Sequence, residues 1–311
     1  MATQTRKTHA RRHTQAMTDW FTRALQALLL LLVFCQAQAA NDKGLLLEAS
    51  KEGRTVYLLG SIHLADKSFY PLRPAIEEAY KDSQALVVEA DVIAMESDLA
   101  LQQQVMLESL YPPGQKLKDH IPEDVYRQLQ DWLHKRQLPE EHFNRLRPAI
   151  AMITLSLIEM QARGLDPKAG IDRHFLNQAH RNDKTTLELE SVLGQLRMLN
   201  SLERPELYLQ QTLAQLGEMD SFVPRMTEAW KSGDQSRLHE LVIKESLQQY
   251  PELAQLFDLL FYQRNVEMAE KIRHFSRQHK KLFVVVGAGH LVGEKSVPYY
   301  LQAAGFDIKQ I

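Results

Sequence analysis

Two stretches of this chain, 57–66 YLLGSIHLAD and 282–293 LFVVVGAGHLVG, share one order: an apolar run, a glycine, two further residues and a histidine. The two histidines are His63 and His290. Continuous apolar runs are typical of strands that are buried on both faces of a parallel sheet. Because ligands bind beyond the carboxyl ends of such strands, both histidines are predicted to lie at one functional edge.

The remaining strands and helices follow from periodicity and composition. Strands are predicted at 45–50, 55–60, 85–90, 186–189, 282–286 and 306–311, and the first two are expected to form a hairpin across KEGR, where Gly53 supplies the turn. Helices are predicted at 71–82, 95–110, 122–136, 146–163 and 171–181, and again through 191–280. The predicted fold class is α/β: a single domain, residues 40–311, with a mostly parallel central sheet and large helical insertions at 95–182 and 191–280.

Composition excludes several classes of protein. The chain has 311 residues, 44% of them hydrophobic, which is enough for a large buried core. Its formal net charge of -2 provides no dominant basic stripe, so no nucleic-acid partner is expected. A mean hydropathy of -0.34 argues against a polytopic membrane protein.

The first forty residues have a composition of their own. Basic residues precede an uncharged apolar core at 24–35, and Ala37-Gln38-Ala39 fits an A-x-A cleavage site. This pattern predicts a secretory signal peptide over 1–39 and a periplasmic or secreted protein with no stable membrane span after cleavage. An uncleaved segment would instead anchor the chain. Cys35 is the only cysteine, so the mature chain is expected to have no disulfide and no thiol nucleophile.

Each predicted parallel strand ends in side chains that could carry chemistry. Glu89 and Asp91 end the second strand, Glu188 and Glu190 end the third, and the two histidines follow the first and the fourth. Two imidazoles and one carboxylate form a metal set with positions left open for water or substrate. A spare carboxylate can serve as general base. His63, Glu89 and His290 are therefore candidate metal ligands, and Glu89 or Glu190 is the candidate proton carrier.

The glycines of these motifs have expected roles as well. Gly60 and Gly287 are expected to adopt positive φ, which would turn the chain sharply off each strand. Gly289 is expected to leave space beside His290 for an approaching ligand.

Structural interpretations remain open for most of these residues. The histidines are also explained as caps of strand ends, and Glu190, on an alternating T-L-E-L-E strand, as a solvated side chain. Solvated side chains are the default for Arg264-Asn265, His174 and His180, and a surface position at a helix start is the default for Arg147. Glu89 differs, because a carboxylate beside four apolar residues must be paired, protonated or ligating. The sequence contains no H-E-x-x-H, P-loop, G-x-S-x-G or G-x-G-x-x-G motif.

Together these motifs resemble the TraB/GumN family, which includes the Tiki metalloproteases. The resemblance runs from about residue 45 to the C-terminus. It is carried by the motifs GSIHLADKSFYPL at 60–72, VVEAD at 87–91, GID at 170–172, LELESVLGQL at 187–196, RNVEMAEKI at 264–272 and VVGAGHLVGEKSV at 285–297.

The resemblance implies a divalent-metal-dependent hydrolase with a peptide or protein substrate. His63, Glu89 and His290 carry over as metal or catalytic residues, with Mn²⁺, Zn²⁺ or Co²⁺ as the ion. Four further residues match positions of the family pattern: Arg147, Glu190, Gln195 and Arg264. Of these, Arg147 and Glu190 are expected to be catalytic. Two departures from the family pattern bear on the pocket: LELES, where a threonine usually follows the glutamate, and RPAIAM in place of lysine-proline-tryptophan.

Three functional hypotheses therefore stand. The first is an exported metal-dependent hydrolase that acts as a peptidase. The second is a non-catalytic accessory protein that captures a ligand such as haem or a peptide on the same fold. The third is a metal-free hydrolase in which histidine is the general base.

Overall fold

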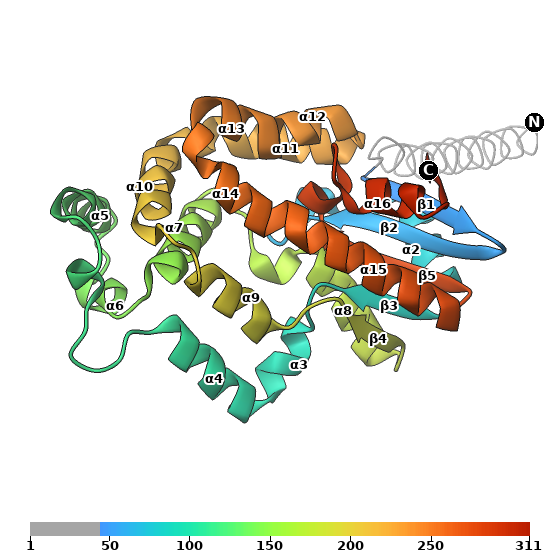
Figure 1. The fold of residues 1–311 in the computed structure, drawn as a ribbon, viewed down its shortest axis with the longest axis horizontal. Helices are drawn as coiled ribbons and strands as arrows, with labels where there is room; N and C mark the ends of the chain where they lie inside the picture. Colours follow the sequence, from blue (N-terminus) through green and yellow to red (C-terminus); the bar gives the residue numbers. More distant parts are fainter. Residues whose placement is uncertain (1–43) are drawn as a thin grey trace, which may run out of the picture. The chain divides into compact units, whose positions relative to one another are not determined.

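A six-stranded sheet in the order β4-β3-β5-β2-β1-β6 forms the framework of the molecule (Figure 1). The structure, a computed structural model, describes residues 44–311, so the predicted signal peptide lies outside the described residues. Strands β4, β3, β5 and β2 are parallel, whereas β1 is antiparallel to both β2 and β6. The predicted α/β class with a mostly parallel sheet is confirmed. The strands are β1 Leu46–Lys51, β2 Arg54–Ser61, β3 Ala85–Val88, β4 Thr185–Glu188, β5 Lys281–Gly287 and β6 Asp307–Gln310.

The hairpin between β1 and β2 has the expected turn. The two strands pair from Leu46 opposite Leu59 to Lys51 opposite Arg54. Glu52 and Gly53 make the turn with φ of 50° and 74°. A glycine at one of these two positions lowers the cost of a left-handed turn conformation.

Helices fill the long connections between the strands. The connection from β2 to β3 contains α2, the connection from β3 to β4 contains α3–α8, and the connection from β4 to β5 contains α9–α15. The helices are α2 Pro74–Asp82, α3 Val92–Ser97, α4 Leu99–Ser109, α5 Glu123–Lys135, α6 Glu140–Asn144, α7 Pro148–Ala162, α8 Ile171–Arg181, α9 Val192–Asn200, α10 Pro205–Gln215, α11 Met219–Ser232, α12 Gln235–His239, α13 Glu245–Gln249, α14 Ala254–Phe257, α15 Gln263–Gln278 and α16 Val297–Ala303.

One predicted helix is in fact two. Residues 95–110 were expected to form a single helix, but the chain breaks at Asp98 between α3 and α4. The Asp98 carboxylate accepts a hydrogen bond from the Leu101 amide at 3.0 Å and caps α4. A short acidic side chain stabilises a helix start by satisfying a free N–H group, and this local bond competes with a continuous helix.

Helices cover both faces of the sheet. On one face, Tyr80 of α2, Phe175 of α8 and Phe283 of β5 pack with ring centroids 4.8 to 5.6 Å apart. Helices α15 and α16 pack against each other, and Figure 1 shows α15 crossing in front of the sheet. Neighbouring side chains of a strand point to opposite faces, and all of Leu282–Val286 is buried. The apolar run of β5 is therefore explained by burial on both faces.

A second core lies within the helical part of the chain. It joins α5, α7 and α10 through Leu129, Leu155 and Leu209, which are all fully buried. Figure 1 places these helices beyond the end of the sheet at which α3 and α9 lie. Helices α5, α7 and α10 therefore form a helical body with its own core, whereas α8 and α15 of the same insertions pack on the sheet.

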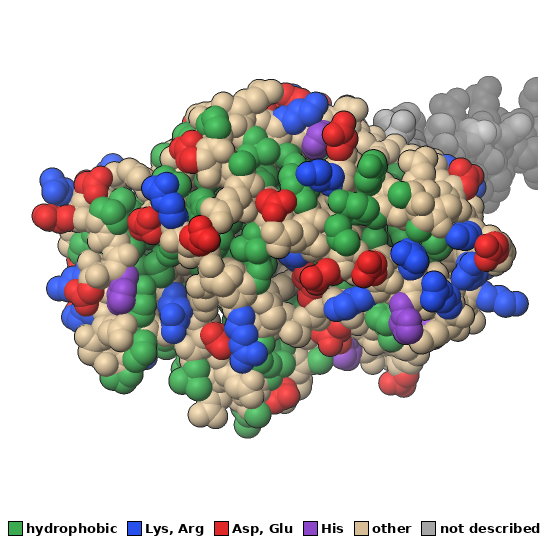
Figure 2. All heavy atoms as spheres, in the orientation of Figure 1, with side chains coloured by type: hydrophobic (Ala, Val, Ile, Leu, Met, Phe, Trp, Pro, Cys, Tyr) green, Lys and Arg blue, Asp and Glu red, His purple; other side chains and the backbone are tan. Residues whose placement is uncertain are grey.

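Charges of both signs are interspersed over the visible face of the described part (Figure 2). This distribution agrees with the small formal net charge of the chain. Within residues 44–311, no helix has the length and apolar character needed to cross a membrane.

Candidate active site

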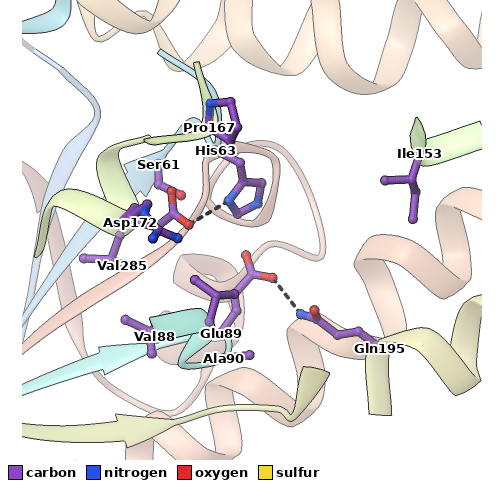
Figure 3. Close-up of a pocket in the computed structure, with 12 residues that line it drawn as sticks. Ser61, His63, Val88, Glu89, Ala90, Ile153, Pro167, Asp172, Gln195 and Val285 are labelled. Atoms are coloured by element: carbon purple, nitrogen blue, oxygen red, sulfur yellow. Dashed lines mark hydrogen bonds and ion pairs between the residues drawn. The ribbon is translucent and has the colours of Figure 1, made fainter. Parts of the chain in front are cut away.

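The side chains of Glu89, His63 and His290 meet in the space beside Gly287. A Cβ atom built on this glycine would lie 3.3 Å from Glu89 Oε1, 3.6 Å from His290 Cδ2 and 3.7 Å from His63 Nε2. Parallel pairing of β3, β5 and β2 places the three strand ends at one edge, as expected for ligand sites of open parallel sheets. A pocket of about 480 Å³ opens here, lined by His63 and Glu89 (Figure 3).

Glu89 is buried and heavily hydrogen-bonded. Its Oε1 accepts from the Gly287 amide at 2.7 Å, and its Oε2 accepts from Arg264 Nη2 at 2.7 Å and Gln195 Nε2 at 3.3 Å. Burial alone raises the pKa of this carboxyl, but the charges of the two histidines and Arg264, with the amide bond, lower it to about 2. Glu89 is therefore ionised at neutral pH, and the paired interpretation of this residue is borne out.

Arg264 links Glu89 to Glu190. Its Nε donates to Glu190 Oε1 and its Nη2 to Glu190 Oε2, both at 2.7 Å, in addition to the bond with Glu89. Gln195 Nε2 also donates to Glu190 Oε2 at 2.8 Å. The expectation that Arg264 is solvated is wrong, because its side chain is only 14% exposed. One guanidinium between two carboxylates offsets the repulsion that they would otherwise exert on each other.

His290 is held as a neutral imidazole with one nitrogen free. Asn265 Nδ2 donates to the Lys295 carbonyl at 2.8 Å, so Asn265 Oδ1 is the atom that faces His290 Nδ1, at 2.6 Å. His290 Nδ1 must therefore carry the proton, which leaves a free lone pair on Nε2, 3.8 Å from Glu89 Oε1. Burial, opposed by the charge of Glu89, lowers the pKa of His290 to about 4. Phe261 packs against the ring with centroids 5.2 Å apart.

His63 has a different environment. Its Nδ1 lies 3.2 Å from Asp172 Oδ2, and 57% of its side chain is exposed. Partial desolvation of the ring lowers the pKa of His63, but the hydrogen bond and charge of Asp172, and the charge of Glu89, outweigh it and raise the pKa to about 9. Gly170 permits this pairing, because a Cβ there would lie 2.4 Å from the His63 carbonyl oxygen and 2.9 Å from Asp172 Oδ1.

Arg147 is placed apart from this cluster. Its guanidinium lies 5.5 Å from the centroid of the Tyr111 ring, and its amide donates to the Ser109 carbonyl at 3.0 Å. It precedes α7 as the residue before Pro148, so the expected position at a helix start is observed. The structure therefore does not bring Arg147 into contact with Glu89 or the two histidines.

The other polar residues at the strand ends form hydrogen bonds outside the cluster of Glu89, His63 and His290. Asp91 Oδ1 accepts from the first amides of α3, and its Oδ2 lies 2.7 Å from His180 Nε2. Glu188 Oε1 accepts from the Asp91 amide at 2.7 Å. His174 Nε2 lies 3.2 Å from Glu77 Oε1 and is part-buried, so its expected solvation is wrong.

The motif glycines are required for reasons of space and not of dihedral angle. Gly287 has φ of -50°, and Gly60 is not among the glycines with positive φ, so the expected left-handed turns are wrong. A Cβ on Gly60 would lie 2.8 Å from Leu45 Cδ2. A Cβ on Gly289 would lie 2.5 Å from Phe261 Cε1, so this glycine admits a packed ring and not a ligand.

The side chains of His63, Glu89 and His290 have the chemistry of metal ligands but are not arranged closely around one point. Within residues 44–311, no group of three or more His, Cys, Asp and Glu side chains is close enough to hold a metal ion as it stands. The chemistry of two donors nevertheless fits a divalent cation: His290 Nε2 has a free lone pair, and Glu89 is ionised. His63 Nε2 faces the same space beside Gly287. The predicted set of three ligands remains a prediction.

Two residues of the site were not identified as such from the sequence. Asp172 stands in the GID motif, but nothing local shows that its partner is His63. Asn265 was expected to be solvated, yet it is 1% exposed. The signal for Asn265 was present, because it continues the buried face of α15 that Met268, Ala269 and Ile272 form at helical spacing.

Comparisons with known proteins identify sequences that are similar to this chain. The sequence profile of the TraB/PrgY/gumN family matches residues 45–310. Uncharacterized protein YbaP of Escherichia coli strain K12 is 28% identical over 252 residues, which cover 80% of this chain and 88% of that protein. Metalloprotease TIKI2 of Xenopus tropicalis is 26% identical over 308 residues, 81% of this chain and 57% of that protein. Metalloprotease TIKI1 of Homo sapiens is 24% identical over 308 residues, 81% of this chain and 59% of that protein. No solved structure matches the chain.

Proposed function

The chain belongs to the TraB/PrgY/gumN family, and from this premise we propose that it is an exported hydrolase that depends on a divalent metal and cleaves peptide bonds. Similarity to proteins named metalloproteases supports a hydrolase at the level of the family. The observation that carries the proposal is the meeting of Glu89, His63 and His290 beside Gly287.

In this proposal His290, Glu89 and His63 would hold the ion. When bound, a divalent metal supplies Lewis-acid polarisation of the substrate carbonyl and activation of water. Asn265 fixes the proton of His290 on Nδ1 and keeps Nε2 available as a donor. Arg264 and the Gly287 amide keep Glu89 ionised.

The two carboxylates have separate roles in this proposal. Both oxygens of each carboxylate accept hydrogen bonds, but Glu89 lines the pocket that contains His63 and Glu190 does not. We assign the transfer of the proton to Glu89 and the positioning of Arg264 to Glu190. A carboxylate that acts only through Arg264 tolerates glutamine better than one that accepts a proton, so Glu190→Gln should retain more activity than Glu89→Gln.

The test combines metal binding with peptide cleavage. The purified chain is titrated with Mn²⁺, Zn²⁺ and Co²⁺, and digestion of a peptide library is followed with and without each ion. We expect one tight metal site and cleavage that His63→Ala and His290→Ala each lower at least about a thousandfold, on the order of 4 kcal/mol. His274→Ala, which removes an exposed histidine of α15, is the matched control. A parent protein that binds no metal, or equal metal content in all variants, would refute the proposal.

Export is tested separately. We propose that cleavage follows Ala39, because small residues at 37 and 39 end the apolar core. Fractionation of expressing cells, followed by N-terminal sequencing, should give an exported protein that begins at Ala40. A chain that keeps residues 1–39 and stays with the membrane would show that the segment is an anchor.

A second candidate is a metal-free hydrolase in which His63, once deprotonated as the pH rises toward about 9, is the general base. The observation in its favour is the pairing of His63 with Asp172 at 3.2 Å, the arrangement by which a carboxylate orients a catalytic imidazole. This candidate predicts cleavage that is insensitive to chelators and is lost in both His63→Ala and Asp172→Ala. Inhibition by a chelator and recovery with added metal would favour the first candidate.

A further inference from the structure

The pocket at the candidate active site has one wall from the sheet edge and another from the helical body. Val88, Ala90 and Val285 belong to the ends of β3 and β5, whereas Ile153 comes from α7. In Figure 3, Ile153 stands on its own helix across the pocket from His63 and Glu89. The helical insertion that follows β3 therefore contributes to the surface that a substrate would meet.

Six of the twelve side chains that line this pocket are apolar. The apolar residues are Val88, Ala90, Val92, Ile153, Pro167 and Val285. Ile153 is the most informative of them, because 46% of it is exposed although Leu155 of the same helix is fully buried in the helical core. Ile153 thus presents apolar surface to the pocket, and a ligand that covered it would remove that surface from water.

Each charged side chain that lines the pocket has a partner of opposite charge or a carboxylate–imidazole contact, although the buried Asp172 Oδ1 accepts no hydrogen bond. Glu89 pairs with Arg264 at 2.7 Å, and His63 lies 3.2 Å from Asp172. Both Nη atoms of Arg173 donate to the Glu96 carboxylate, at 2.7 and 2.8 Å. A charged substrate side chain placed here would be desolvated without a free countercharge, which is costly.

We propose that this pocket binds an uncharged apolar side chain next to the scissile bond of a peptide substrate and that Ile153 determines this specificity. The inference rests on the proposed function, because it takes the occupant to be the substrate of the same site. The pocket volume of about 480 Å³ lies within the range of pockets that enclose small ligands. The helical body would thus select substrates, while the sheet edge supplies the reacting groups.

The experiment measures cleavage and binding separately. Peptides identical except for Leu, Gln, Asp or Lys beside the cleaved bond are assayed for kcat/KM with the purified chain and added Mn²⁺. Their fluorescein-labelled forms are assayed for binding by anisotropy. The variants are Ile153→Val, Ile153→Asp and, as the matched control, Tyr299→Asp, which places the same charge on a side chain that is 50% exposed on α16.

We expect the Leu peptide to be cleaved at least about tenfold better than the Asp and Lys peptides, since a hydrophobic pocket discriminates by factors of this order. Ile153→Asp should lower kcat/KM for the Leu peptide at least about tenfold and raise it for the Lys peptide. Ile153→Val and Tyr299→Asp should rank the four peptides by kcat/KM as the parent protein does. The inference is overturned if Ile153→Asp lowers kcat/KM for all four peptides by one common factor. It is also overturned if the parent protein binds none of the peptides or binds all four equally. Selective binding of the Leu peptide with no cleavage would retain the apolar pocket and refute the hydrolase.

Discussion

The two G-x-x-H segments end neighbouring parallel strands, yet they place their histidines in contrasting environments. His290 is 4% exposed, packs against Phe261 and donates its Nδ1 proton to a neutral amide, Asn265. His63 is 57% exposed and faces a carboxylate, Asp172. The motif thus sets where each histidine leaves the sheet. Burial then keeps His290 neutral, whereas Asp172 from a distant helix keeps His63 charged.

This contrast separates two roles within one site. A neutral imidazole that is buried and fixed by Asn265 is a ready donor for a cation. An imidazole that is half exposed and held by Asp172 is charged over most of the neutral range, so a cation must displace its proton. We therefore expect His290 to be the fixed member of the pair and His63 the member that responds to pH and to metal.

The largest expected effect is on stability and activity together. His290→Ala should abolish activity and lower the free energy of unfolding by about 2–4 kcal/mol, because it leaves a buried cavity and an unpaired Asn265 oxygen. His63→Ala should abolish activity as well but change the free energy of unfolding by less than about 1 kcal/mol, since its ring is half exposed. Urea unfolding and peptide cleavage give the two quantities. Equal destabilisation by the two substitutions would break the comparison.

The next effect is on stability in acid. The pKa of His290 is about 4 in the folded protein and near 6.5 in the unfolded chain, so the unfolded chain binds more protons between these values. The free energy of unfolding of the metal-free protein should therefore fall by about 3 kcal/mol as the pH drops from 6.5 to 4. His290→Gln should remove most of this dependence. Glu89 has a folded pKa of about 2, so its protonation lowers stability only below about pH 4.5. This range hardly overlaps with the range from pH 6.5 to 4 in which His290 acts.

His63 should show the opposite sign. Its pKa is raised in the folded protein, so its contribution to stability is fully present below pH 6.5 and is lost as the pH rises toward about 9. Because more than half of the ring is exposed, solvent screens the interaction and the effect should be small. If the contribution of His63 to the free energy of unfolding rises between pH 7 and pH 9, the raised pKa of His63 in the folded protein is contradicted.

An effect on activity without loss of stability is expected at the point where the two histidines meet. Gly287→Ala is compatible with the backbone φ of -50°, so the free energy of unfolding should change by less than about 1 kcal/mol. The added methyl would stand 3.3 to 3.7 Å from Glu89, His290 and His63 and occupy the space between them. We expect kcat/KM to fall about a hundredfold, or about 2.7 kcal/mol. Gly217→Ala, where a Cβ meets nothing within 4 Å, is the control.

The sequence contained the strand ends but not the partners that give them their chemistry. Apolar runs and a turn glycine predicted the sheet and its hairpin, because burial on two faces leaves a continuous apolar pattern. The same logic missed the break at Asp98, where one side-chain hydrogen bond outweighs helix periodicity. Arg264 and Asp172 were beyond reach for a different reason: each meets its partner across more than a hundred residues of chain, and no local pattern encodes that contact.

The smallest expected effect tests whether Asp172 creates the difference between the histidines. Asp172→Asn keeps a side-chain oxygen near His63 Nδ1 but removes the negative charge, so the pKa of His63 should fall from about 9 toward its ordinary value while that of His290 stays near 4. The measurement is an NMR titration of the imidazole protons in the metal-free protein. A loss of about tenfold in kcat/KM, within the range for residues that orient a ligand or base, should accompany the pKa change. Asp172→Ala should lose more activity, because it also removes the hydrogen bond that orients the ring. If the pKa of His63 is the same in the parent and in Asp172→Asn, the charge of Asp172 does not set the contrast, and exposure alone must account for it.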